Sequence, residues 1–186
     1  MKKQILALLL VVIATFSMNA QKTVSGVKVD DKLSLDGKNL TLNGAGIREK
    51  FWMDLYVGSL YTTKKTTNGQ DVIDSKDAAA IKLNIVSGMI TSEKMINAVN
   101  EGFENATNKN TASLKTKIDK FKGFFKDKIT KGDVFIIMYD GNEVHVYKNG
   151  AKKGSIDGYD FKKALFGIWL GKKPADDDLK DGMLGK

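Results

Sequence analysis

The chain of 186 residues contains no cysteine, and this absence excludes several classes of protein. Without thiols there can be no disulfide framework, no thiolate metal site, no cysteine nucleophile and no lipid-acylated N-terminal cysteine. The single histidine, His145, excludes a metal centre with two histidine ligands, so we expect no metal and no cofactor. Stability must come from the core, and a hydrophobic fraction of 42% supports one for a single domain of this length.

Long hydrophobic runs are also scarce, because the only one covers residues 5–16. Lys2 and Lys3 precede this run and the small residue Ala20 follows it, which is the layout of a secretory signal peptide. The run is shorter than the roughly 20 apolar residues of a membrane span, although an uncleaved N-terminal anchor remains the alternative. We therefore predict a signal peptide at residues 1–20, one exported domain at residues 21–186, and a periplasmic or secreted location.

Arginine is nearly absent from a chain whose formal net charge is +8. The lysines between residues 109 and 131 are spaced to lie on the outer face of a helix, and arginine, the usual reader of base edges, occurs once. A solvated basic face explains this pattern, so we expect no nucleic-acid partner. Loose attraction to an anionic lipid surface remains possible.

Hydrophobic periodicity predicts strands and helices in separate blocks. Alternation predicts strands at residues 24–29, 32–42, 51–61, 80–86, 133–139, 143–148 and 152–156. Recurrence at three and four residues predicts helices at 92–105, 111–128, from Asp160 to Gly171, and 176–183, with a short helical or irregular segment within 64–76. This order predicts an α+β domain with helices layered on one face of an antiparallel sheet.

Arg48 follows a glycine-rich segment, residues 43–46, and precedes an apolar strand. No helix starts directly after these glycines, so we predict a tight turn rather than a phosphate-binding loop. A guanidinium that stays charged when partly buried suits a carboxylate or phenolate in an apolar pocket. The alternative is a structural ion pair with Glu49 or Asp54, and the sequence leaves both open.

Two further groups have simpler explanations than catalysis or metal binding. His145 shares a strand face with Glu143 and Tyr147, so we expect an outward, non-catalytic histidine. The acids at residues 176–178 stand at a helix start, where they complement the helix dipole. We therefore expect no catalytic and no metal-ligating residue.

Residues 42–51 and 56–61, together with 91–103 and 164–171, resemble the chalcone isomerase-like family, and its bacterial exported branch in particular. The resemblance implies an open-faced β-sandwich, in which helices cover one side of a large curved antiparallel sheet and a ligand cleft lies between them. Plant isomerases of this fold close a chalcone to a flavanone. Non-catalytic members bind fatty acids, and their carboxylate-holding arginine corresponds to Arg48.

The isomerase site itself does not carry over. The catalytic threonine of the family falls near Leu55 and Tyr56, its tyrosine falls on Thr91, and its asparagine on Ala98, with Asn97 adjacent. The isomerase needs hydroxyl and amide groups to hold a water against the substrate ketone. The resemblance therefore favours binding over catalysis.

Our leading hypothesis is an exported, non-catalytic, monomeric protein that binds a fatty acid or similar amphiphilic anion. Its candidate ligand-binding residues are Arg48, Tyr56, Tyr61, Thr91 and Asn97. The alternatives are an intramolecular lyase of the chalcone isomerase type and a structural or partner-binding envelope protein whose cleft is filled by side chains.

Overall fold

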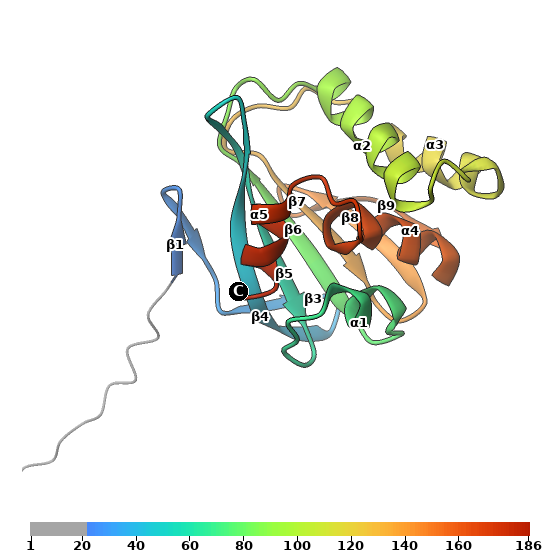
Figure 1. The fold of residues 1–186 in the computed structure, drawn as a ribbon, viewed down its shortest axis with the longest axis horizontal. Coiled ribbons are helices and arrows are strands. Elements are labelled where there is room, and N and C mark those ends of the chain that lie inside the picture. The colour runs from blue at the N-terminus through green and yellow to red at the C-terminus, as the bar shows by residue number, and fades with distance from the viewer. Residues whose placement is uncertain (1–21) are drawn as a thin grey trace, which may run out of the picture.

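The computed structural model describes residues 22–186 (Figure 1). The signal peptide predicted for residues 1–20 lies outside the described residues. The strands are β1 (Lys22–Val24), β2 (Val27–Val29), β3 (Lys32–Leu35), β4 (Lys38–Lys50), β5 (Met53–Thr62), β6 (Ala79–Ile85), β7 (Val134–Tyr139), β8 (Glu143–Lys148) and β9 (Ala151–Asp157). The helices are α1 (Gly69–Asp74), α2 (Ser92–Ala106), the 3-10 turn η1 (Ala112–Leu114), α3 (Lys115–Gly123), α4 (Tyr159–Leu170) and α5 (Asp177–Met183).

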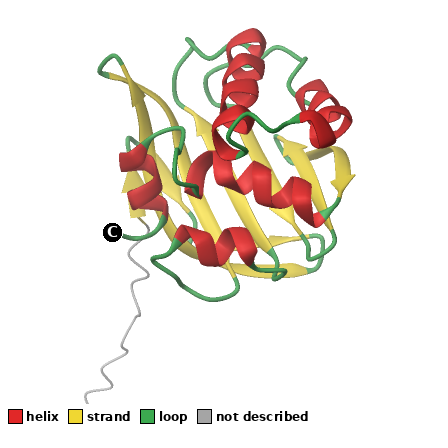
Figure 2. Cartoon of the chain, turned by 45° about the vertical axis from the view of Figure 1, so that its right-hand side comes forward, coloured by secondary structure: helices red, strands yellow, loops and turns green. Residues whose placement is uncertain are grey.

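Seven strands form one antiparallel sheet in the order β3-β4-β5-β6-β7-β8-β9. The helices lie together on one face of this sheet (Figure 2). The hairpin of β1 and β2 packs on the other face, where Val29 contacts a small cluster with Ala45 and Val57. The predicted α+β architecture, an open-faced sandwich with helices on one face of a curved antiparallel sheet, is confirmed.

The main hydrophobic core fills the space between the sheet and the helices. The helical stripes predicted from the sequence supply it, since Met95, Val99 and Phe103 of α2 are all buried. Thr91 is the N-cap of α2, because its side chain accepts a hydrogen bond from the Lys94 amide. No helix in the described part of the chain is long and apolar enough to span a bilayer.

The sheet curls over its helix-free face. The turn between β3 and β4 reaches β8 and β9, where Asp36 accepts a hydrogen bond from Tyr147 and lies 3.4 Å from the Lys152 ammonium. A smaller cluster that includes Leu40, Tyr61, Ala80 and Met138 packs on this face. The curl thus gives the sheet a second, smaller core beneath the one that the helices cover.

The turn predicted at residues 43–46 is wrong, because these residues lie inside the long strand β4. They contain a bulge between Leu42 and Gly44, and the glycines serve close packing rather than chain reversal. A Cβ atom on Gly44 would lie 2.4 Å from the carbonyl oxygen of Gly182 in α5. The missing side chains therefore let α5 lie directly on the backbone of β4.

Several element boundaries also differ from the prediction, and the strand expected at 51–61 begins only at Met53. The strand expected at 24–29 is a hairpin, because Ser25 and Gly26 turn the chain with φ of 45° and 75°. The helix expected at 111–128 is shorter, with η1 before α3 and an end at Gly123. The helix expected from Asp160 begins at Tyr159 with Gly158 at the N-cap position, so Asp160 lies in the first turn of α4.

Candidate ligand-binding site

A pocket of about 320 Å³ lies between the far end of the β4–β5 hairpin and the first turns of α2. It is the size of a small ligand site. Its lining residues are Arg48, Lys50, Phe51, Met53, Leu55, Tyr56, Met89, Ile90, Lys94, Met95, Asn97, Ala98 and Glu101. Apolar side chains therefore form most of the wall, and a few polar groups interrupt it.

Arg48 is half-buried at the sheet side of this pocket. Strand register places it opposite Tyr56, and its guanidinium carbon lies 5.7 Å from the centre of the Tyr56 ring. Among the described residues it forms no ion pair, since Asp54 instead accepts a hydrogen bond from Ser25 and Glu49 is exposed. The structural ion pair considered from the sequence is therefore wrong, and Arg48 lines the pocket without an ion-pair partner among the described residues.

Tyr56 is a buried hydroxyl next to this charge. Its oxygen accepts a hydrogen bond of 3.0 Å from the indole nitrogen of Trp169 in α4. Burial raises the pKa of Tyr56 although the Arg48 charge opposes the rise, so the phenol is neutral at physiological pH. Because the oxygen already accepts from Trp169, its proton remains available for donation to a ligand oxygen.

Helix α2 supplies the opposite wall through residues that share one face. Lys94, Asn97 and Glu101 follow one another at three and four residues, which places them in line along the helix. The amide of Asn97 can donate and accept hydrogen bonds, and Lys94 adds a second cation. Both walls therefore combine apolar side chains with a few polar groups.

The structure brings three of the five predicted site residues together, namely Arg48, Tyr56 and Asn97. Tyr61 is elsewhere because it lies five residues after Tyr56 on a strand, so its side chain points to the helix-free face. There its hydroxyl donates to the carbonyl oxygen of Asp30. Thr91 does not line the pocket either, since its side chain caps α2. Neither residue therefore lines this pocket.

The sequence analysis missed several lining residues and one supporting residue. Helical spacing from Asn97 would have found Lys94 and Glu101, because all three lie on one face of a confirmed helix. No local pattern pointed to Trp169, which lies 113 residues from the Tyr56 hydroxyl that it contacts. That contact depends on how α4 packs on the sheet.

His145 lies on the helix-free face of β8 and is therefore remote from this pocket. Only 8% of it is exposed, so it is more covered than an outward strand residue should be. Its Nε2 atom lies 3.0 Å from a carboxylate oxygen of Asp140. This contact with the turn between β7 and β8 accounts for the low exposure of the histidine side chain. The lining of the pocket contains no histidine, and Glu101 is its only carboxylate.

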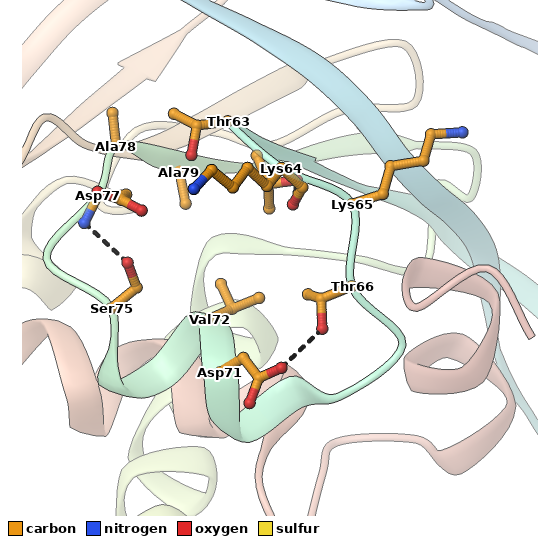
Figure 3. A pocket seen from close by; sticks show the side chains of 11 residues that line it. Thr63, Lys64, Lys65, Thr66, Asp71, Val72, Ser75, Asp77, Ala78 and Ala79 are labelled. Atoms are coloured by element: carbon orange, nitrogen blue, oxygen red, sulfur yellow. Dashed lines mark hydrogen bonds between the residues drawn. The ribbon is translucent and has the colours of Figure 1, made fainter.

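A second pocket of about 310 Å³ lies at the other end of β5, between the loop that leads to α1 and the start of β6 (Figure 3). Two of its polar pairs bond within the protein. The hydroxyl of Thr66 donates to Asp71 at 2.9 Å, and Ser75 accepts from the Asp77 amide at 2.9 Å. This pocket offers no unpaired buried group, so the Arg48 pocket is the stronger candidate.

Comparisons with known proteins agree with this fold. A model of the chalcone isomerase-like family matches residues 21–185, whereas no curated protein matches the sequence. Among solved structures, the crystal structure of a fatty-acid binding protein from Arabidopsis thaliana is similar, with a TM-score of 0.67 at 17% sequence identity. The likeness covers 86% of this chain and 92% of that one. A match over nearly the whole described chain, on a sheet of the same architecture, shows that the chain belongs to the chalcone isomerase-like family.

Proposed function

We propose that this protein binds a fatty acid or a similar amphiphilic anion in the Arg48 pocket without transforming it. The observation that carries the proposal is the Arg48 guanidinium, which faces an apolar pocket and has no carboxylate partner among the described residues. A half-buried cation without an anion gains most from a ligand that supplies one. The carboxylate of a fatty acid supplies the charge, and its chain fits the apolar wall.

The remaining polar groups suit recognition of a carboxylate. Tyr56 can donate its hydroxyl proton to one carboxylate oxygen while Arg48 pairs with the other. The pocket lacks a histidine, and its lone carboxylate belongs to an exposed residue on α2, Glu101. Both features support binding rather than proton transfer. The fatty-acid binding protein from Arabidopsis, which shares the fold, supports the same class of ligand.

The test is a titration with a fatty acid and with the fatty alcohol of the same chain length. We expect the wild type to prefer the acid, and Arg48→Ala to lose that preference, with a drop in affinity for the acid of about tenfold or more. Arg48→Lys keeps the charge but loses the bidentate geometry, so its affinity should fall between the two. Lys65→Ala, remote from the pocket, is the matched control.

The results against the proposal are equally definite. Equal affinity of the wild type for the acid and the alcohol would show that the protein does not recognise the carboxylate. An Arg48→Ala variant that binds the acid like the wild type would remove Arg48 from the site. In either case the pocket would not be an anion site.

We further propose that the protein acts outside the cytoplasm after removal of residues 1–20. The positive start, the apolar run at 5–16 and the small residue Ala20 support this proposal. The intact mass of the protein recovered from the cell envelope or medium tests it. A mass that includes residues 1–20 would instead support the uncleaved anchor.

A further inference from the structure

The exposed large apolar side chains of the described chain gather at one end of the molecule. They are Phe51, Trp52, Met53 and Met89, with exposed fractions of 73%, 96%, 38% and 41%. Phe51 and Trp52 form the end of the β4–β5 hairpin, which extends well past α5 in Figures 1 and 2. We call these four residues the apolar tip. Three of them also line the Arg48 pocket, so the tip surrounds its mouth.

The backbone of the tip is unusual for its sequence. Lys50 pairs with Met53, which leaves Phe51 and Trp52 as a two-residue turn with φ of 53° and 60°. Turns of this kind normally use Asn-Gly, because bulky residues resist positive φ. Burial does not compensate this cost, since Trp52 is almost fully exposed. Two aromatic residues that are strained and yet exposed to solvent do not stabilise the fold. They therefore indicate contact with another molecule.

Positive charge accompanies the apolar tip. Arg48, Lys50 and Lys94 line the pocket beside it, against the single acid Glu101. The Lys50 ammonium lies 5.7 Å from the centre of the Phe51 ring, at the base of the turn. Two more acids of the hairpin, Glu49 and Asp54, lie opposite each other in the strand register and do not line the pocket. The pocket mouth therefore presents cations around an apolar centre.

We propose that the apolar tip docks on an anionic lipid bilayer. Trp and Phe side chains partition to the level of the lipid headgroups, and nearby lysines pair with anionic headgroups. Such a posture places the mouth of the Arg48 pocket at the membrane surface, where an amphiphilic ligand enters or leaves. That last step rests on the proposed function, whereas docking itself does not.

Binding to vesicles of phosphatidylcholine, with and without phosphatidylglycerol, tests the docking. We expect sedimentation with the anionic vesicles and much weaker sedimentation with the neutral ones. Trp52→Gly should lower binding to the anionic vesicles by about tenfold. This variant should fold at least as well as the wild type, because glycine accepts the positive φ without strain. Thermal unfolding of the two proteins checks that point.

A charge-matched pair of variants tests the electrostatic part. Lys50→Gln/Lys94→Gln should lose about tenfold or more in affinity for the anionic vesicles, since each cation near the surface contributes about 1 kcal/mol. Lys64→Gln/Lys65→Gln changes the net charge equally at the other end of β5 and should bind like the wild type. Equal losses of vesicle affinity in both variants would show that only the net charge of the protein matters. That result would overturn docking by the tip.

Tryptophan emission gives a direct report of the contact. Trp52 is exposed whereas Trp169 is 4% exposed, so a blue shift on addition of vesicles reports on Trp52. Absence of the shift, or sedimentation of Trp52→Gly with the anionic vesicles like the wild type, would overturn the proposal. Self-association that Trp52→Gly abolishes, without vesicle binding, would assign the tip to a second copy and also overturn it.

The two proposals fail independently. Trp52 does not line the pocket, so Trp52→Gly should keep the fatty-acid affinity of the wild type. A protein that binds fatty acid in the titration but ignores vesicles would contradict docking alone. One that binds vesicles through Trp52 but shows no preference for the acid would contradict only the proposed function.

Discussion

Lys162 is a single residue on which the position of a whole helix depends. It is fully buried, and its ammonium donates to the carbonyl oxygens of Val72 at 2.5 Å, Ile73 at 2.9 Å and Ser75 at 2.7 Å, at the end of α1. Burial lowers the pKa of Lys162 to about 8, so it keeps its charge at neutral pH. It therefore satisfies the carbonyl groups that the last turn of α1 leaves without partners.

We predict that Lys162→Met lowers the free energy of unfolding by about 2–4 kcal/mol, because methionine fills the space but leaves buried carbonyl groups unpaired. Urea denaturation at neutral pH measures the loss. Lys163→Met, next in sequence, is the control. Lys163 is half-exposed, and its ammonium lies as far as 4.0 Å from the Asp74 carboxylate, so this ion pair is weak. Its change should stay within about 0.5 kcal/mol. Equal losses in the two variants would contradict the capping role.

The candidate site shows how far single residues could be predicted. Arg48 was identified because it is the only arginine and stands before an apolar strand, and the structure places it in the pocket. Tyr61 lies outside the pocket because strand parity sends it to the opposite face from Tyr56. Thr91 lies outside the pocket lining, and its hydroxyl caps the helix that begins after it. The sequence thus indicated which types of residue could bind a ligand. The direction in which each side chain points depended on strand register and helix capping.

At the scale of elements, the glycines of β4 and α5 form a backbone contact. A Cβ atom on Gly182 would lie 2.7 Å from the Cα atom of Gly46 and 2.9 Å from the carbonyl oxygen of Ala45. Both neighbours are backbone atoms, so no flexible side chain can move to make room. Helix α5 can therefore keep its place only if these positions stay without side chains.

We predict that Gly182→Ala destabilises the protein by about 1–3 kcal/mol, because the added methyl group pushes α5 away from β4. Gly123→Ala at the end of α3 is the matched control, since its Cβ atom would meet nothing within 4 Å. That variant should be neutral or slightly stabilising, as alanine favours helix more than glycine does. Thermal unfolding compares the two variants. If Gly123→Ala were destabilised as much as Gly182→Ala, the loss could not be assigned to crowding between α5 and β4.

The turn between β7 and β8 makes stability depend on pH. Burial tends to raise the pKa of Asp140, but hydrogen bonds from the Glu143 amide, the His145 ring and the Asn142 amide outweigh it and lower the pKa to about 2. In the unfolded chain this carboxyl titrates near 3.8. Between these values the unfolded state binds more protons, so stability falls as the pH decreases.

We therefore predict that Asp140→Asn removes part of the acid sensitivity of the fold. The variant should be less stable than the wild type by about 2 kcal/mol above pH 4, and the difference should shrink as the pH falls toward 2. Urea denaturation at several pH values measures the difference. A constant difference between pH 2 and 6 would show that the ionisation of Asp140 does not stabilise the turn.

Element types were predictable where periodicity was long and were not where glycine was involved. The stripe of α2 and the alternation of β8 each match an element of the structure. Residues 43–46 looked like a turn because glycine favours turns, yet the same residue type also permits close approach of a helix. Only the position of α5, more than 130 residues later, decides between these two uses of glycine.

At the scale of the whole molecule, curvature is the property that local sequence could not supply. The predicted order of strands and helices gave an α+β class, and the family resemblance added a curved sheet. The contact that closes the curl joins Asp36 and Tyr147, which are 111 residues apart. Such a pairing follows from how seven strands twist together, because each local hairpin would form equally well in a flatter sheet.

The same contact yields a prediction about that closure. The hydrogen bond from Tyr147 lowers the pKa of Asp36, so the pair is strongest when the carboxyl is ionised. We expect Tyr147→Phe to lower the melting temperature by about 2–4 °C at neutral pH, as loss of one hydrogen bond does in a domain of this size. The loss should vanish in the background of Asp36→Ala, because the acceptor of the hydrogen bond is then gone. If Tyr147→Phe lowers the melting temperature equally in both backgrounds, the residue acts by packing alone, and the curl of the sheet does not depend on this bond between its distant strands.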